Sequence, residues 1–239
     1  MPFPSFKLLS LATTALTHYY STAPPIPPPG PDDEVYTGQP FEKMIPALRR
    51  CSMIALTIAL ACEYAVLASF AYPGAVSLPA HLYETLCPRS MADGRAFQSM
   101  PPVFLAGLSL TVTGCLIRLW CYKVLGKIFT YEVTLRPSHM LVTHGPYAYV
   151  RHPSYTGLYM HFGGIAVLHF SPGGWNRECG IMSTLARWWI GLWLVLTAFT
   201  FASVWRRSIV EDKIMKKKFG SQWEQYRRDV PFKILPGII

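Results

Sequence analysis

The chain has 239 residues, of which 51% are hydrophobic and only 15% are charged, and its mean hydropathy is +0.24. An average soluble domain carries roughly 25% charged residues, so this composition argues against a soluble domain and indicates an integral membrane protein. The net charge of +9 does not indicate nucleic-acid binding, because many of the basic residues flank apolar runs, as topology signals do.

The first apolar run covers residues 4–22 and is a marginal candidate for a membrane helix. It carries no charge apart from Lys7, but threonine and histidine dilute it. A cleaved signal peptide is the competing interpretation, although no clear small-residue cleavage site precedes Pro24. We expect a retained membrane helix, followed by a polyproline-like linker at 23–31.

Two stronger apolar runs follow at 51–72 and 102–122, joined by a loop of mixed polarity at 74–100. About twenty helical residues at about 1.5 Å each match a hydrocarbon core of roughly 30 Å. Glu63 lies inside the first of these runs. A carboxylate at this depth is either hydrogen-bonded between helices or catalytic, and we favour the structural role.

The second half of the chain has two further apolar runs. The run at 155–170 is short for a full crossing and ends at a strong turn signal, Ser-Pro-Gly-Gly. The last run covers 188–204. The tail at 209–226 has a broken apolar face, which predicts an amphipathic helix, and Gly220 is expected to break or cap it. Such a basic helix also suits an anionic lipid surface.

Basic residues gather at one end of each strong run. They are Lys43, Arg49, Arg50, Lys123, Lys127, Arg136, Arg151, Arg206, Arg207, Lys213, Lys216, Lys217 and Lys218. The positive-inside rule then places 123–152 and the tail on the cytoplasmic face. The sequence predicts an all-α, polytopic membrane protein with about five membrane segments. We divide it into an N-terminal segment with the linker (1–50), membrane helices (51–126) and a C-terminal region (127–239).

The six cysteines form no Cys-x-x-Cys pair, so a zinc site or a thioredoxin-like motif has no support. Four of them lie in or beside apolar runs, where cysteine usually acts as a small hydrophobic residue. Cys87 and Cys179 fall in connecting loops and could pair. Because spacing alone does not fix connectivity, we expect them to be unpaired.

The most unusual stretch runs from His144 to Gly157, a polar and constrained block between apolar runs. Such a block is costly beside membrane helices unless it binds something. Pro153 restricts His152 to an extended conformation and fits the first turn of the next helix. The three tyrosines of the block offer aromatic faces that attract cations. The residue types alone leave a cofactor site and an interfacial Tyr/His belt equally open.

Other kinds of site have little support. The chain has no glycine-rich nucleotide fingerprint, no Walker loop and no nucleophile elbow. His139, His144 and His152 are five and eight residues apart, which matches no metal-binding helix face, and we expect no metal.

In the tail, Arg207 and Glu211 are four residues apart and share a helix face. They could form a simple ion pair. Alternatively, the arginine would bind an anionic substrate and the carboxylate would bind a polar or cationic cofactor group. Arginine suits bidentate recognition of a carboxylate better than lysine does.

Taken together, these residues resemble the isoprenylcysteine carboxyl methyltransferase family. The resemblance is carried by Arg151-His152-Pro153-Ser154-Tyr155-Thr156-Gly157 preceded by Gly145-Pro146-Tyr147, and then by Arg207, Glu211-Asp212, Phe219-Gly220, Trp223, Tyr226 and a terminal Pro-Gly-Ile. It covers about the last 110 residues. The N-terminal half is similar only as a set of spanning helices, and their small number is compatible with a fungal-type or plant-type member.

The resemblance implies S-adenosylmethionine as methyl donor and a cytoplasmic C-terminal cofactor site in a multi-pass protein of the endoplasmic reticulum membrane. It implies that the acceptor is the C-terminal carboxylate of an S-prenylated cysteine on CaaX-processed proteins. Arg207 would hold that carboxylate as the catalytic and substrate-binding residue. The implied cofactor-binding residues are His139, Met140, Leu141, Val142, Tyr147, His152, Pro153, Ser154, Tyr155 and Glu211.

Two positions depart from the family pattern. Glu211-Asp212 stands where many members have Glu-Glu, and Glu132 stands where a glutamine is found in some members, which leaves the role of Glu132 open. The chemistry needs no general base, because a terminal carboxylate with a pKa of roughly 3.3–3.7 is already ionised. What it needs is in-line placement of the two reactants at about 3–3.5 Å.

Three alternatives stay open at this point. A phospholipid amine N-methyltransferase would use the same cofactor, although amine attack gains nothing from a nearby arginine. A membrane sterol reductase has similar C-terminal motifs but would use NADPH. A membrane scaffold without catalytic activity would bind no cofactor.

Overall fold

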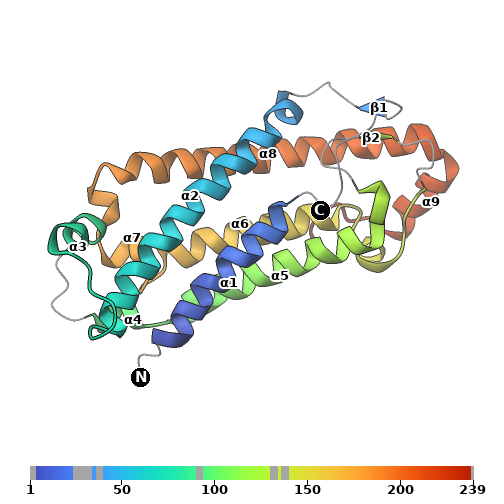
Figure 1. The fold of residues 1–239 in the computed structure, drawn as a ribbon. Coiled ribbons are helices and arrows are strands. Elements are labelled where there is room, and N and C mark those ends of the chain that lie inside the picture. The colour runs from blue at the N-terminus through green and yellow to red at the C-terminus, as the bar shows by residue number, and fades with distance from the viewer. Residues whose placement is uncertain are drawn as a thin grey trace.

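The computed structural model describes residues 4–23, 34–35, 40–89, 94–129, 134–135 and 140–237. Long helices dominate these residues and lie roughly side by side along one axis (Figure 1). They are α1 (Pro4–Thr22), α2 (Pro40–Ala71), α5 (Pro102–Leu125), α6 (Pro153–Phe170) and α8 (Ala186–Phe219). The prediction of an essentially all-helical fold is therefore confirmed. Two short strands, β1 (Glu34–Val35) and β2 (Thr134–Leu135), pair antiparallel.

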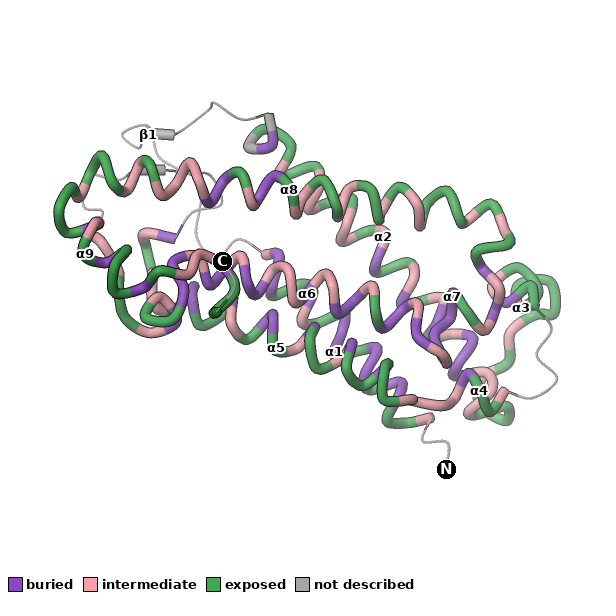
Figure 2. The backbone as a smooth tube through the Cα atoms, turned by 180° about the vertical axis from the view of Figure 1, so that it is seen from behind, coloured by how far each residue is buried: buried purple, intermediate pink, exposed green. Residues whose placement is uncertain are grey.

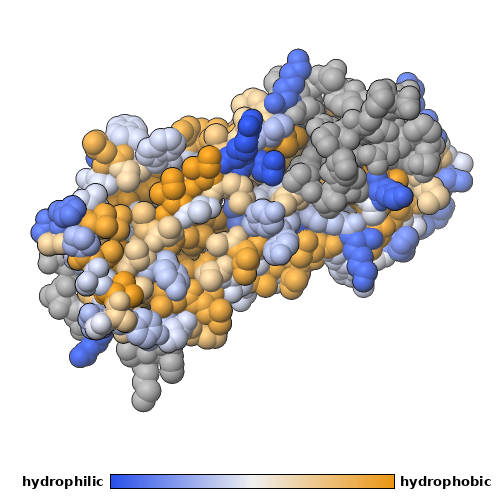
Figure 3. Space-filling model, in the orientation of Figure 1, coloured by the Kyte–Doolittle hydropathy of each residue, from blue (hydrophilic) through white to orange (hydrophobic). Residues whose placement is uncertain are grey.

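Within the described residues, three segments are long and apolar enough to cross a membrane: Lys43–Ala71, Arg95–Ile128 and Ala186–Phe219. The protein is thus a multi-pass membrane protein, and Figure 3 shows hydrophobic residues over much of the middle of one face. The structure places helices at the two weaker predicted positions as well, but whether they cross the bilayer, and so the count of five membrane segments, stays a prediction, as do the domain boundaries.

Short helices make up the connections. They are α3 (Ala80–Leu86), α4 (Arg95–Gln98), η1 (Gly126–Ile128), η2 (Gly145–Ala148), α7 (Trp175–Glu178), η3 (Ile181–Ser183) and α9 (Ser221–Asp229). The tail prediction needs a correction here. The residues after 204 continue α8 without a break as far as Phe219, and only Gly220, at φ 51°, ends the helix, so α9 starts in a new direction.

Close contact between α5 and α6 fixes the centre of the fold. A Cβ added at Gly114 would lie 2.5 Å from the Gly157 carbonyl oxygen, and one added at Gly164 would lie 2.5 Å from the Thr111 nitrogen. Two glycines seven residues apart on each helix therefore let the backbones touch, as small residues do in membrane bundles. This seam fixes where α6 begins, and the start of α6 carries the candidate site.

Polar side chains attach α1 to this pair. His18 and His161 stack with their nearest nitrogens 3.2 Å apart. Arg118 on α5 donates to the Ser21 carbonyl at 2.8 Å and to the Ser154 carbonyl at 3.1 Å. One arginine thereby joins the end of α1 to the first turn of α6, so α1 packs in the bundle; its retention stays a prediction.

Glu63 lies between helices as the sequence predicts, but among the described residues it has ion-pair partners and no hydrogen-bond partner. Its carboxylate is fully buried, 3.8 Å from the Lys7 ammonium and 3.4 Å from His169 Nδ1. Lys7 also donates to the carbonyls of Phe97 and Gly173. The carboxylate thus links α1, α2 and α6 at the end of the bundle near α4 and α7.

The expectation of unpaired cysteines is wrong. Cys87 and Cys179 form a disulfide across 92 residues of sequence. Their loops meet because Trp175 Nε1 donates to the Leu86 carbonyl at 2.8 Å and the Arg89 amide donates to the Cys179 carbonyl at 3.1 Å. This proximity is a tertiary feature that cysteine spacing does not carry.

Burial is uneven along the bundle. Figure 2 shows buried segments where α1, α5, α6 and α7 pack, whereas most of α8 is exposed or intermediate. The buried residues of α8 all lie in one short stretch, Ser203, Val204, Arg207 and Ser208. A helix whose exposed surface is mostly apolar suits a lipid environment, and its buried polar part marks where it meets the rest of the protein.

Candidate active site

The block from His144 to Gly157 starts α6 at the predicted proline, but His152 is not extended as predicted, since its φ is −126° and its ψ is 60°. Gly145 takes φ 64° and opens η2, which makes a tight turn. Pro153 is the first residue of α6, directly after His152. His152 is therefore fixed at the start of a helix whose position is set by the α5–α6 seam.

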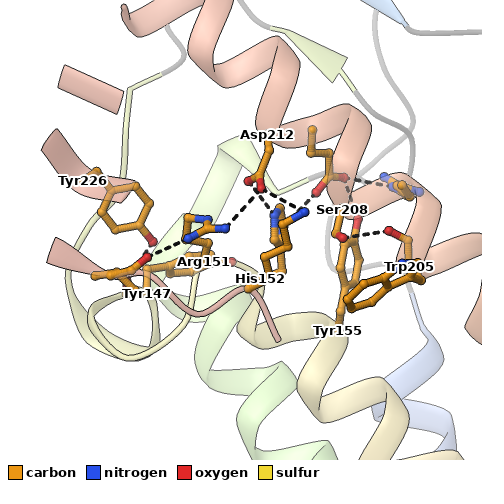
Figure 4. A network of polar contacts seen from close by, with 12 residues as sticks. Tyr147, Arg151, His152, Tyr155, Trp205, Ser208, Asp212 and Tyr226 are labelled. Atoms are coloured by element: carbon orange, nitrogen blue, oxygen red, sulfur yellow. Dashed lines mark hydrogen bonds and ion pairs between the residues drawn. The ribbon is translucent and has the colours of Figure 1, made fainter. Parts of the chain in front are cut away.

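Two carboxylates from α8 hold the His152 ring from both sides (Figure 4). Asp212 Oδ1 is 2.9 Å from Nε2, and Glu211 Oε2 is 3.2 Å from Nδ1. Ionised carboxylates only accept hydrogen bonds, so this arrangement suits an imidazolium ring, which can donate from both nitrogens. Burial by itself would lower the pKa of His152, but the bonds and charges of Asp212 and Glu211 outweigh it and raise that pKa.

Glu211 also organises the other side of the site. Its Oε1 accepts from Arg207 Nε at 2.9 Å and from the Tyr155 hydroxyl at 2.5 Å. The Tyr155 and His152 rings stack, with centroids 5.5 Å apart. The i,i+4 ion pair expected between Arg207 and Glu211 is thus present, and it is part of a larger network that includes the constrained block.

The C-terminal segment completes this network. Arg151 is buried and donates to the carbonyls of Val230 at 2.8 Å and Pro231 at 2.6 Å, and its other nitrogen is 3.4 Å from Asp212. The amides of Arg151 and His152 donate to the carbonyls of Phe232 and Lys233. Residues 230–233 thus run alongside the block and hold it in place.

Tyr226 on α9 ties the tail to the block, because its hydroxyl donates to the Tyr147 carbonyl at 2.8 Å. Burial strongly raises the pKa of the Tyr147 phenol and also raises that of Tyr226. Both tyrosines are therefore neutral hydroxyls and aromatic surfaces at physiological pH, not sources of negative charge.

A cavity of about 320 Å³ joins these groups. The candidate residues that line it are Met140, Leu141, Val142, Tyr147, His152, Ser154, Tyr155, Arg207 and Glu211. Pro153 does not line it and acts by starting α6. His139 and Glu132 lie outside the described residues. The sequence thus named nine residues that line one cavity, from segments some fifty residues apart.

Sequence reasoning gave no role to Arg151 and treated Asp212 only as a departure from a pattern. Arg151 and Asp212 join the block, α8 and the C-terminal segment. Two signals were present: a charged residue directly before His-Pro, and an acidic residue directly after Glu211. The cavity-lining Trp223 and Arg118 were also missed as parts of the site.

A family model described as the isoprenylcysteine carboxyl methyltransferase family matches residues 107–191. The resemblance to this family is thereby confirmed. The part of the chain that matches the methyltransferase family contains the α5–α6 seam and the whole constrained block. It ends before Arg207 and Glu211, which the structure places at the wall of the cavity.

Curated relatives carry the same description. A protein-S-isoprenylcysteine O-methyltransferase B of Arabidopsis thaliana is 29% identical over 132 residues, covering 52% of this chain and 55% of the relative. The protein-S-isoprenylcysteine O-methyltransferase of Schizosaccharomyces pombe is 32% identical over 108 residues, covering 44% and 38%. A probable enzyme of this kind from Oryza sativa subsp. indica is 28% identical over 130 residues, covering 54% and 59%. The matches thus span about half of this chain and about 40–60% of these relatives.

A solved structure, described as the eukaryotic intramembrane Ras methyltransferase ICMT, aligns with 95% of this chain and 74% of its own, at 18% identity and a TM-score of 0.46.

Proposed function

We propose that this protein transfers a methyl group from S-adenosylmethionine to the C-terminal carboxylate of an S-prenylated cysteine. The observation that carries the proposal is one continuous cavity with two kinds of wall. Its polar end holds Arg207, Glu211 and His152, and its other part lies between apolar surfaces of α2, α6 and α8. A substrate with a carboxylate at the end of a long apolar chain matches this arrangement.

The residues at the polar end fit the cofactor in charge and shape. Glu211 is an anion that would attract the amino group or the sulfonium, and Tyr147 and Tyr155 offer aromatic surfaces to a cation. Met140, Leu141 and Val142 add apolar contacts for an adenosine. When bound, the cofactor supplies an electrophilic methyl group. The protein's own task is to hold it against the acceptor and exclude water.

Arg207 would orient the acceptor. Its guanidinium is buried and its Nε donates to Glu211, which fixes the direction of the guanidinium plane. A carboxylate bound there is already ionised and needs no base. Holding two reactants in line can contribute several kcal/mol to catalysis. Because the partner Glu211 shares the positive charge, Arg207 would orient the carboxylate without quenching it as a nucleophile.

We further propose that the site faces the cytoplasm from the endoplasmic reticulum membrane and acts on prenylated protein C-termini. The Cys87–Cys179 disulfide supports this orientation, because disulfides persist in oxidising compartments such as the lumen. Its loops lie at one end of the bundle, and the candidate site lies at the other end (Figure 1).

The test is methyl transfer from labelled cofactor to N-acetyl-S-farnesylcysteine in membranes holding the full chain. We expect base-labile label with wild type and a loss of at least about a hundredfold with Arg207→Ala, since a bidentate anchor of the reacting group is removed. The neighbouring Arg206, which is exposed, gives the matched control Arg206→Ala. Label on lipid amines, or no label at all, would overturn the proposal.

A further inference from the structure

One face of α8 lines the cavity well beyond Arg207. Val204, Thr200, Thr197 and Trp193 lie on it at steps of three or four residues, as one face of a helix requires. Because α8 is one unbroken helix, the number of residues between two lining positions gives their distance along the cavity. Thr197 is ten residues from Arg207, about 15 Å at about 1.5 Å per residue. Trp193 is fourteen residues away, about 21 Å.

Trp193 is the last residue of this lining face, counted from Arg207, that packs against the interior of the bundle. It is half-buried and packs against the hydrophobic core while also lining the cavity. Trp189, one turn further along, also lines the cavity but is 72% exposed. Beyond Trp193 the lining therefore opens sideways to the surroundings of the helix instead of continuing into the bundle.

The length of an acceptor can be compared with this distance. An extended chain advances about 1.2 Å per bond, as the peptide backbone does. From the carboxylate carbon, the main chain of a farnesyl cysteine spans about 15 bonds and so about 18 Å, and that of a geranylgeranyl cysteine spans about 19 bonds and so about 23 Å. The farnesyl end falls between the levels of Thr197 and Trp193, and the fourth isoprene unit reaches the level of Trp193.

We propose that Trp193 sets the prenyl length that this site prefers. A farnesyl group fits between Arg207 and Trp193, whereas the last unit of a geranylgeranyl group meets the indole and must turn out past Trp189 toward lipid. The chain therefore favours farnesyl over geranylgeranyl acceptors. This inference rests on the proposed function, because it takes Arg207 as the anchor of the acceptor carboxylate.

The experiment compares kcat/KM for S-farnesyl and S-geranylgeranyl forms of N-acetylcysteine in membranes. Trp193→Ala should raise the ratio of geranylgeranyl to farnesyl by about tenfold, the lower end of the scale at which a hydrophobic pocket discriminates small apolar groups. Trp188→Ala is the matched control, because Trp188 is exposed on the same helix and does not line the cavity. Its ratio should stay at the wild-type value. A ratio of two acceptors in one preparation does not depend on how much of the variant folds.

A second variant tests the same length assignment by shortening the cavity instead of lengthening it. Thr197→Phe places a ring at about 15 Å, which should lower kcat/KM for farnesyl by several-fold while sparing S-geranylcysteine, whose chain of about 11 bonds spans about 13 Å. An unchanged ratio in Trp193→Ala, or equal loss of both acceptors in Thr197→Phe, would overturn the length assignment. Wild type that methylates none of the three acceptors would instead overturn the proposed function.

Discussion

Both ends of the helical bundle bury ionised groups, but the two groups differ in whether they line the cavity. Near α4 and α7, Glu63 and Lys7 are completely shielded and do not line the cavity. Near α9, the Glu211 side chain keeps 19% of its surface exposed and faces the cavity. The Lys7–Glu63 cluster therefore joins helices, whereas the cluster around Glu211 can also contact a ligand in the cavity. At the first end a substitution should change stability, and at the second it should change binding.

The largest effect is expected at the end near α4 and α7, where Lys7 and Glu63 are buried; we call it the sealed end. Lys7→Ala leaves Glu63 buried without its ammonium partner, which typically costs about 3–5 kcal/mol. The melting temperature in detergent should fall, while the KM for acceptor, measured well below that temperature, should stay at the wild-type value. The double variant Lys7→Met with Glu63→Leu removes both charges and should recover much of the stability. A changed KM with unchanged melting would mean that this cluster takes part in the site.

Glu211→Gln should show the opposite behaviour. It keeps the shape of the side chain but removes the charge that faces Arg207, His152 and the proposed cofactor. We expect cofactor binding to weaken about ten- to hundredfold, as for loss of a charge-assisted bond, while the acceptor KM changes less. Calorimetric titration with S-adenosylmethionine measures the effect. Glu224 is partly exposed and does not line the cavity, so Glu224→Gln is the control and should bind as wild type does.

Much of this arrangement follows from local sequence, and the rest depends on packing. Length and hydropathy located the long helices, and Pro153 and Gly220 marked a start and an end. The residues near His152 and Arg207 could be named because their chemistry is unusual beside apolar runs. The disulfide and the role of Arg151 could not be predicted, because both depend on segments that meet only in three dimensions. The stretch after 204 was wrongly separated from its helix, because polarity changes there while helical backbone continues.

The seam between α5 and α6 connects the two ends and gives an effect of intermediate size. In Gly157→Ala the new Cβ would lie 2.6 Å from the Gly114 carbonyl oxygen, so the helices must separate. Overpacking of this kind costs about 1–3 kcal/mol, and the displaced start of α6 should also weaken cofactor binding. Gly163→Ala on the same helix meets nothing within 4 Å and should leave stability equal or slightly higher. Equal melting temperatures for the two variants would contradict the claim that the close contact between α5 and α6 requires glycine at residue 157.

The smallest expected effect is a pH dependence of stability that arises at the cavity end, from His152. Because the pKa of His152 is raised in the folded chain, the charged ring stabilises the fold fully below its unfolded pKa of about 6.5. That contribution is lost as pH rises through the raised value. It amounts to about 1.4 kcal/mol for each pH unit by which folding raises the pKa. The melting difference between wild type and His152→Gln should therefore shrink from pH 6 to pH 9.

The sealed end supplies the control for this measurement. Lys7→Met also removes a buried cation, but lysine does not titrate near neutral pH in the unfolded chain, where its pKa is about 10.4. The difference between wild type and Lys7→Met should stay nearly constant from pH 6 to pH 7.5, over the range in which the His152 difference begins to fall. A His152 difference that grows with pH would mean that the ring is neutral in the fold, and that Asp212 and Glu211 do not both hold it.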